Sequence, residues 1–180
     1  MYLLALITAL WLWYLPPTRV HPLVAWVLLA YFAVVTVIDI EHRLILHPVS
    51  AAGAVLCGII GIWRHGWLST LLGGAAGFGA MLLLYLLGEV FARWMARCRG
   101  EPLEDEVALG FGDVNLAGVI GLLLGYPGIV AGLTLTILLG GGVSFLYLMW
   151  MLARKQYRAF TAIPYGPFLV AAAVILFFSR

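Results

Sequence analysis

Long apolar stretches recur from one end of this sequence to the other and restrict what the chain can fold into. Hydrophobic residues make up 64% of its 180 residues and charged residues only 10%, whereas about a quarter of a soluble domain is charged. About 20 apolar residues of helix cross a hydrocarbon core about 30 Å thick. The sequence therefore predicts an all-α membrane protein, a polytopic bundle of six to seven transmembrane helices in one domain over residues 1–180. The predicted spans are Tyr2–Tyr14, Pro22–Ile38, Pro48–Trp63, Trp67–Trp94, Val114–Leu124, Pro127–Leu152 and Pro164–Phe178.

The first and fifth stretches decide whether the count is six or seven. Tyr2–Tyr14 is short, but it lacks the basic leading region and small-residue cleavage site of a signal peptide. A retained span is therefore predicted. The fifth stretch reaches back to Ala108 only if Asp113 lies inside the helix or at its end.

Basic residues separate into two groups if the N-terminus is cytoplasmic. The inside loops then hold most of them, which agrees with the excess of Lys and Arg in cytoplasmic loops of membrane proteins. The inside group is Arg43, Arg93, Arg97, Arg99, Arg154, Lys155 and Arg158, and the outside group is Arg19, Arg64 and Arg180.

Glycine pairs at the G-x-x-x-G spacing predict close packing between helices. In lipid, small residues let helix backbones approach each other. Packing within the bundle is favoured over homodimerisation, and the sequence indicates no oligomeric state. The pairs are Gly73/Gly77, Gly121/Gly125 and Gly128/Gly132, and Gly140–Gly142 adds a further smooth patch.

Several classes of function are not supported by composition or motifs. The net charge of +2 is too small to suggest a nucleic-acid partner, and Cys57 and Cys98 form neither a C-x-x-C pair nor a disulfide framework. No zinc motif or other metal site is predicted, because the histidines are scattered and no H-E-x-x-H occurs. The serines also have no basic side chain at the same membrane depth that could activate them as nucleophiles. The histidines are His21, His42, His47 and His65, and the serines considered are Ser50, Ser69 and Ser144.

Two aspartates border predicted spans at the same membrane face. Asp39 ends the second span and Asp113 begins the fifth, although a carboxylate there costs a few kcal/mol. Each has an ordinary alternative explanation: Asp39 could pair with Arg43 one turn on, and Asp113 could cap a helix. Gly110 and Gly112, just before Asp113, would let an extended chain approach the carboxylate closely.

Two facing carboxyl groups can hydrolyse a peptide bond without a metal or other cofactor. Like charges a few Å apart do not both ionise cheaply, so the pair shares one proton. One carboxylate then acts as general base on a water while the protonated partner polarises the scissile carbonyl.

Three segments together resemble the type IV prepilin peptidases, a family that includes archaeal preflagellin peptidases. Gly110–Asp113 looks like the family's G-x-G-D motif, Ile38–Ile45 like the motif around its first catalytic aspartate, and Ile163–Phe168 like its Pro-aromatic-Gly-Pro-Phe segment. The resemblance implies an intramembrane aspartyl endopeptidase with Asp39 and Asp113 as the catalytic pair. It also implies a multi-pass protein of the inner (cytoplasmic) membrane whose active site faces the cytoplasm. The implied partners are the lipid bilayer and pilin-like precursors that carry a short basic leader followed by an apolar helix.

The sequence departs from the family pattern at three points. Asn115 replaces the common lysine two residues after the G-x-G-D aspartate, and the proline after Asp39 comes only at Pro48, behind His47. The paired C-x-x-C motifs of large bacterial members are absent, so the resemblance implies a peptidase-only form.

Two further segments are expected to shape the site or bind substrate. Pro164 and Pro167 are predicted to keep Tyr165 and Gly166 non-helical near the aspartates, although proline is also common in a first helical turn. An acidic loop is expected to attract the basic leader, with a solvated loop beside Arg97 and Arg99 as the alternative. The loop residues are Glu101, Glu104, Asp105 and Glu106.

Two other functions stay open at this point. Paired intramembrane carboxylates also serve as proton or cation relays, so a transporter or an assembly partner with a degenerate peptidase fold is the main alternative. A presenilin or signal-peptide-peptidase type of aspartyl protease, which shares G-x-G-D, is the second.

Overall fold

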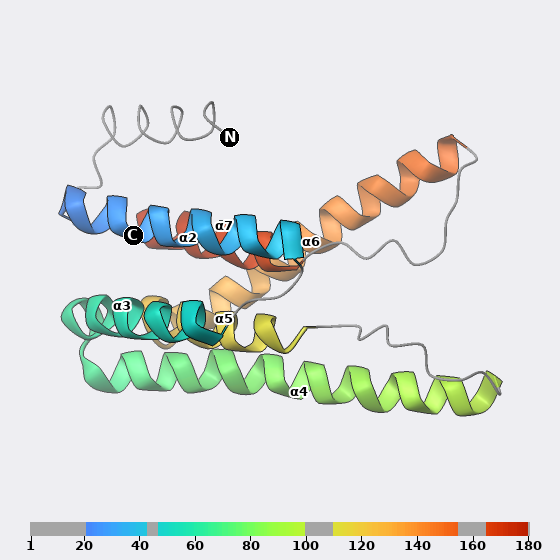
Figure 1. The fold of residues 1–180 in the computed structure, drawn as a ribbon, viewed down its shortest axis with the longest axis horizontal. Helices are drawn as coiled ribbons and strands as arrows, with labels where there is room; N and C mark the ends of the chain where they lie inside the picture. Colours follow the sequence, from blue (N-terminus) through green and yellow to red (C-terminus); the bar gives the residue numbers. More distant parts are fainter. Residues whose placement is uncertain (1–20, 43–46, 100–109, 155–164, 180) are drawn as a thin grey trace.

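The described part of the chain is entirely helical. A computed structural model describes residues 21–42, 47–99, 110–154 and 165–179, which form six helices and no strand (Figure 1). The all-α prediction is confirmed for these residues, whereas the predicted span Tyr2–Tyr14 lies outside them. The helices are α2 (Pro22–His42), α3 (His47–His65), α4 (Trp67–Arg99), α5 (Phe111–Leu124), α6 (Gly128–Ala153) and α7 (Gly166–Ser179).

Three of the described helices are long and apolar enough to cross a membrane. The segments are Pro22–Glu41, Trp67–Trp94 and Gly128–Ala153. Helices α5 and α7 are also apolar but have 14 residues each, or about 21 Å of helix. The structure thus supports an integral membrane protein, and the count of six to seven spans stays a prediction.

Neighbouring helices run in opposite directions along one bundle axis. In Figure 1, α2, α4 and α6 run one way and α3, α5 and α7 run back. The residues that join them allow tight turns: Gly66 between α3 and α4 has φ 79°, and Gly125 after α5 has φ 64°, values that glycine adopts without steric cost. Ser69 Oγ donates a hydrogen bond to the Tyr126 carbonyl (2.8 Å), and Tyr126 N–H donates one to the Ser69 carbonyl (2.9 Å).

Helix α5 lies at the centre of the core, and it packs on α4 through glycines. A β-carbon added at Gly73 would lie 2.7 Å from Cα of Gly125, and one added at Gly121 would lie 2.7 Å from the carbonyl carbon of Gly73. A β-carbon at Gly77 would collide with the Ala117 carbonyl. The predicted packing role of G-x-x-x-G is confirmed at these positions, because the two backbones are in direct contact there.

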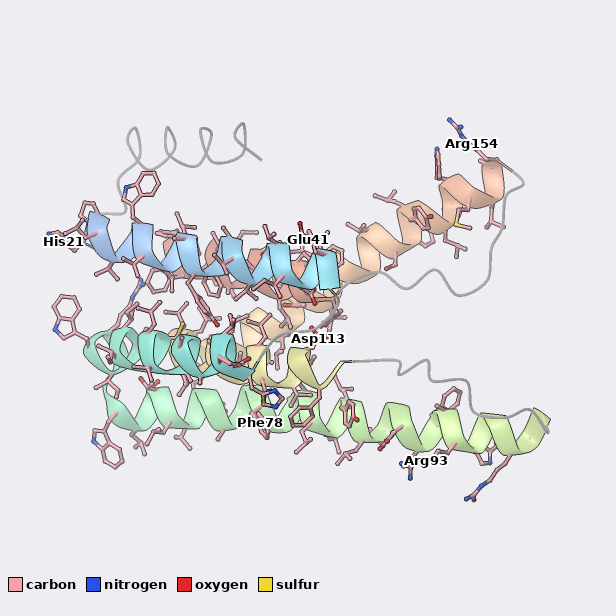
Figure 2. All side chains as sticks on the ribbon, in the orientation of Figure 1. His21, Glu41, Phe78, Arg93, Asp113 and Arg154 are labelled. Carbon is pink, nitrogen blue, oxygen red and sulfur yellow. The ribbon has the colours of Figure 1, made fainter. Side chains whose placement is uncertain are left out.

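Arginine side chains lie at both ends of the bundle. Arg64, at the end of α3, donates a hydrogen bond to the Phe177 carbonyl (3.3 Å) and lies 4.4 Å from the centre of the Phe177 ring. Arg93 and Arg154 lie near the ends of α4 and α6 that point the other way (Figure 2). Figure 1 also shows that the second half of α6 diverges from the other helices.

Candidate active site

Asp39 is buried in the last turns of α2. Its side chain is 5% exposed, and its Oδ2 atom has no hydrogen-bond partner among the described residues. Its predicted alternative partner, Arg43, lies outside the described residues. A buried carboxylate oxygen without a partner is costly in a purely structural role, so Asp39 is a candidate for chemistry.

The beginning of α7 lies directly against Asp39. A β-carbon added at Gly166 would collide with Oδ2 of Asp39 and lie 2.9 Å from its Cγ, and the backbone N–H of Gly166 faces this carboxyl group. Gly166 is thus the residue that lets α7 approach Asp39 so closely.

One prediction for this segment is wrong in part. Tyr165 precedes the helix as expected, but α7 begins at Gly166, and Pro167 lies in its first turn. The carbonyl of Tyr165 accepts hydrogen bonds from the N–H groups of Phe168 (3.1 Å) and Leu169 (3.3 Å). Proline is compatible with this helix because the first N–H groups have no intrahelical acceptor. Pro164 lies outside the described residues.

Asp113 occupies the first turn of α5 and does not cap it. The cap position is Gly110, with extended backbone (φ −73°, ψ 141°) and no side-chain capping bond. The N–H of Asp113 donates a hydrogen bond to the Gly110 carbonyl (3.0 Å), and the Asp113 carboxylate turns back toward the backbone N–H of Gly110. The helix-cap explanation of Asp113 is therefore wrong, and its side chain, 9% exposed, is directed inward.

The structure brings the two carboxyl groups together from α2 and α5. Asp39 and Asp113 are close enough to repel each other electrostatically, and the Tyr165 hydroxyl is close enough to interact with Asp113. Figure 2 shows Asp113 at the same end of the bundle as Glu41, two residues beyond Asp39. Charges that interact in a poorly solvated site influence each other strongly, so the ionisation of one of these carboxyl groups affects that of the other.

An aromatic contact that the sequence did not reveal fixes the start of α5. The ring of Phe111 meets that of Tyr85, on α4, edge to face, with centroids 5.9 Å apart and planes at 77°. The position of Tyr85 within the predicted span Trp67–Trp94 could have suggested this contact. Gly112, in the same first turn, is half-buried.

The remaining predicted site residues cannot be placed. Glu101, Glu104, Asp105 and Glu106 all lie outside the described residues, so the leader-binding role stays a prediction. Within the described ranges, no group of three or more His, Cys, Asp or Glu side chains gathers into a possible metal site.

Comparison with known proteins places the chain in a family. The sequence model of the type IV leader peptidase family matches residues 26–145, a range that contains both Asp39 and Asp113. The chain belongs to the type IV leader peptidase family. The family predicted from the sequence is thereby confirmed, and two of its three segments, Ile38–Ile45 and Gly110–Asp113, lie within the matched residues.

One relative shows how much of the chain is similar to a known member of the family. The chain is 26% identical over 155 residues to the prepilin leader peptidase/N-methyltransferase of Xanthomonas campestris pv. campestris. The match covers 84% of this chain and 48% of the relative, so the chain spans about half the length of the relative it matches. No solved structure matches the chain.

Proposed function

We propose that this member of the type IV leader peptidase family is an intramembrane aspartyl endopeptidase. Its substrates would be type IV prepilin-like precursors, from which it removes the short basic leader. The observation that carries the proposal is the convergence of two buried carboxyl groups, Asp39 and Asp113. One oxygen of Asp39 has no hydrogen-bond partner within the described part of the chain.

The reaction follows from sharing one proton between the two carboxyl groups. The ionised carboxylate removes a proton from a water as that water attacks the scissile carbonyl carbon, while the protonated carboxyl donates to the carbonyl oxygen. The tetrahedral intermediate collapses when the C–N bond breaks: the leaving amine takes a proton from one carboxyl group, and the other carboxylate removes a proton from a hydroxyl of the intermediate. Water is consumed, and the two carboxyl groups return to one shared proton.

The N-termini of two helices favour negative charge near Asp39 and Asp113. Helices α5 and α7 both begin beside the carboxyl groups, at Phe111 and Gly166. Their first N–H groups have no intrahelical acceptor, and the helix dipoles are positive there. These termini can stabilise the carboxylate in the resting site and the oxyanion that develops during hydrolysis.

The proposed orientation places this end of the bundle at the cytoplasmic face of the inner membrane. Arg93, Arg97 and Arg154 lie at the same end of α4 and α6, and basic residues favour the cytoplasmic side. A precursor whose basic leader is cytoplasmic would then present its cleavage site on the side where Asp39 and Asp113 lie.

Leader cleavage by the purified protein in lipid nanodiscs tests the proposal. A peptide with a basic leader and an apolar segment should be cut by the unchanged protein, and Asp39→Asn or Asp113→Asn should reduce turnover to background. The control is Glu89→Gln on the exposed Glu89–Arg93 pair (2.9 Å), which should keep most activity. If either aspartate variant cuts substantially, the mechanism is wrong. If the unchanged protein does not cut but moves protons or cations across proteoliposomes, the relay alternative is correct.

A further inference from the structure

The residues directly before Asp113 carry few side chains that could hold them in place. Gly110 and Gly112 have none, and the helix cap at Gly110 makes no side-chain hydrogen bond. Among the described residues, a β-carbon at Gly110 would have Asp113 Oδ2 (3.8 Å) and Gly112 N (3.9 Å) within 4 Å. On the C-terminal side of Asp113, Val114 is fully buried in the core. On its N-terminal side, Phe111 is the one residue of the preceding three with a side chain, so the contact that holds Phe111 bears on the position of Asp113.

The contact of Phe111 with Tyr85 ends the α4–α5 interface on the side of the aspartates. Going along α4, Gly73 contacts Gly121 and Gly77 contacts Ala117 through backbone atoms. Tyr85 follows on α4 and meets Phe111 on α5, in the antiparallel register of the earlier contacts.

The two rings differ in how they are held. Tyr85 is partly buried and packs against the hydrophobic core, on a long helix that Figure 1 shows continuing past the start of α5. Phe111 is 43% exposed, and its contact with Tyr85 supports one side of its ring. Tyr85, the ring that packs on the core, is on α4. Phe111, the ring that it contacts, is two residues before Asp113.

We infer that Tyr85 is a positioning residue for the carboxyl pair, acting through the ring of Phe111 on Asp113. Tyr85 itself touches no reacting atom. Its aromatic ring, rather than its hydroxyl group, does the positioning, because the contact is an edge-to-face ring contact. The expected effect on kcat rests on the proposed function. The expected effect on the position of Asp113 rests on the geometry alone.

The expected kinetic effect falls on turnover more than on substrate binding. Tyr85→Leu keeps an apolar side chain but removes the ring, so kcat should fall by about 5- to 10-fold, within the range that corresponds to one lost aromatic contact. KM should change less than about two-fold, because a group that acts on the dyad affects the transition state. Tyr85→Phe should keep kcat within about two-fold.

A matched control exists on the same helix. Phe91 and Trp94 form a second aromatic pair of α4, with centroids 6.1 Å apart, and this pair does not involve α5. Phe91→Leu removes an aromatic ring from the same helix and should leave kcat unchanged. Because Phe91 is 57% exposed, the melting temperature of Phe91→Leu should fall no more than that of Tyr85→Leu. Phe111→Leu should reproduce the loss of Tyr85→Leu, and the double variant should be no worse than either, because the two rings form one contact.

A readout without catalysis separates the inference from the proposed function. In a Cys57→Ser/Cys98→Ser background, Asp39→Cys and Asp113→Cys should form a disulfide under mild oxidant. Adding Tyr85→Leu should slow this cross-linking several-fold, whereas Phe91→Leu or Tyr85→Phe should not. Equal rates and equal kcat for Tyr85→Leu and Phe91→Leu would overturn the inference, and so would an effect of Tyr85→Phe as large as that of Tyr85→Leu. Absence of leader cleavage with the cross-linking pattern intact would overturn the proposed function alone.

Discussion

Gly166, the first residue of α7, lies directly against the carboxyl group of Asp39 in the last turns of α2. A β-carbon at position 166 would lie 2.9 Å from Cγ of Asp39 and still closer to its Oδ2. Helix α7 therefore sets the position of this carboxyl group, and the absence of a side chain at position 166 is what allows the contact.

Gly166→Ala is predicted to reduce leader cleavage by at least about ten-fold, because the added methyl group must displace Asp39 or α7. The control is Gly79→Ala, at a helical glycine with no atom within 4 Å of an added β-carbon. Steady-state kinetics on both variants measure the effect. Full activity of Gly166→Ala would show that the Asp39 carboxyl group is not held as described.

Gly77→Ala is predicted to destabilise the bundle by about 1–3 kcal/mol, because its β-carbon would collide with the Ala117 carbonyl on α5. Gly79→Ala, two residues along the same helix, should be neutral or slightly stabilising, since alanine suits a helix better than glycine. Thermal unfolding of both variants in the same detergent provides the comparison. Equal melting temperatures would contradict the direct backbone contact of α4 and α5.

Arg64→Gln is predicted to lower stability by about 1 kcal/mol, because it removes the contact with the Phe177 ring and weakens the bond to the Phe177 carbonyl. Cleavage should not change, since Arg64 lies at the opposite end of the bundle from Asp113. Arg154→Gln is the matched control: Arg154 lies 4.8 Å from the Trp150 ring on its own helix, and that pair joins no two helices. A loss of kcat in Arg64→Gln without a loss of stability would contradict this assignment.

The double variant Asp39→Asn/Asp113→Asn is predicted to be no less active than either single variant. Two groups that share one proton act as a unit, so losing either removes the whole function. Rates are best compared at high enzyme concentration, where residual cleavage is measurable. A double variant at least ten-fold slower than both single ones would indicate two independent contributions.

Much of the architecture could be predicted because hydropathy is a local property of the chain. Segments such as Trp67–Trp94 are apolar over more than a bilayer's thickness, and they form helices in the structure. The ordered motifs around Asp39 and Asp113 also identified the family that the comparison confirmed. The glycine spacing at Gly73 and Gly77 predicted close packing, since only small residues allow backbone contact in lipid.

The details of the candidate site could not be predicted in the same way. The sequence suggested Asp113 as a possible helix cap and Gly166 as non-helical, but the structure caps α5 with Gly110 and begins α7 at Gly166. Helix ends depend on which backbone groups find partners, and a proline is as compatible with a first turn as with a loop.

By itself, the sequence determined that this is a membrane-helix protein with two aspartates at helix ends, because apolar length and a charged residue's cost in lipid depend on local composition. Only the tertiary structure decided that Gly166 would meet Asp39 and that Tyr85 would support Phe111. The first contact joins α2 and α7, which are far apart in the chain, and the second joins two consecutive helices, α4 and α5. Their geometry is set by how close the backbones come at the glycines between them, which no single segment specifies.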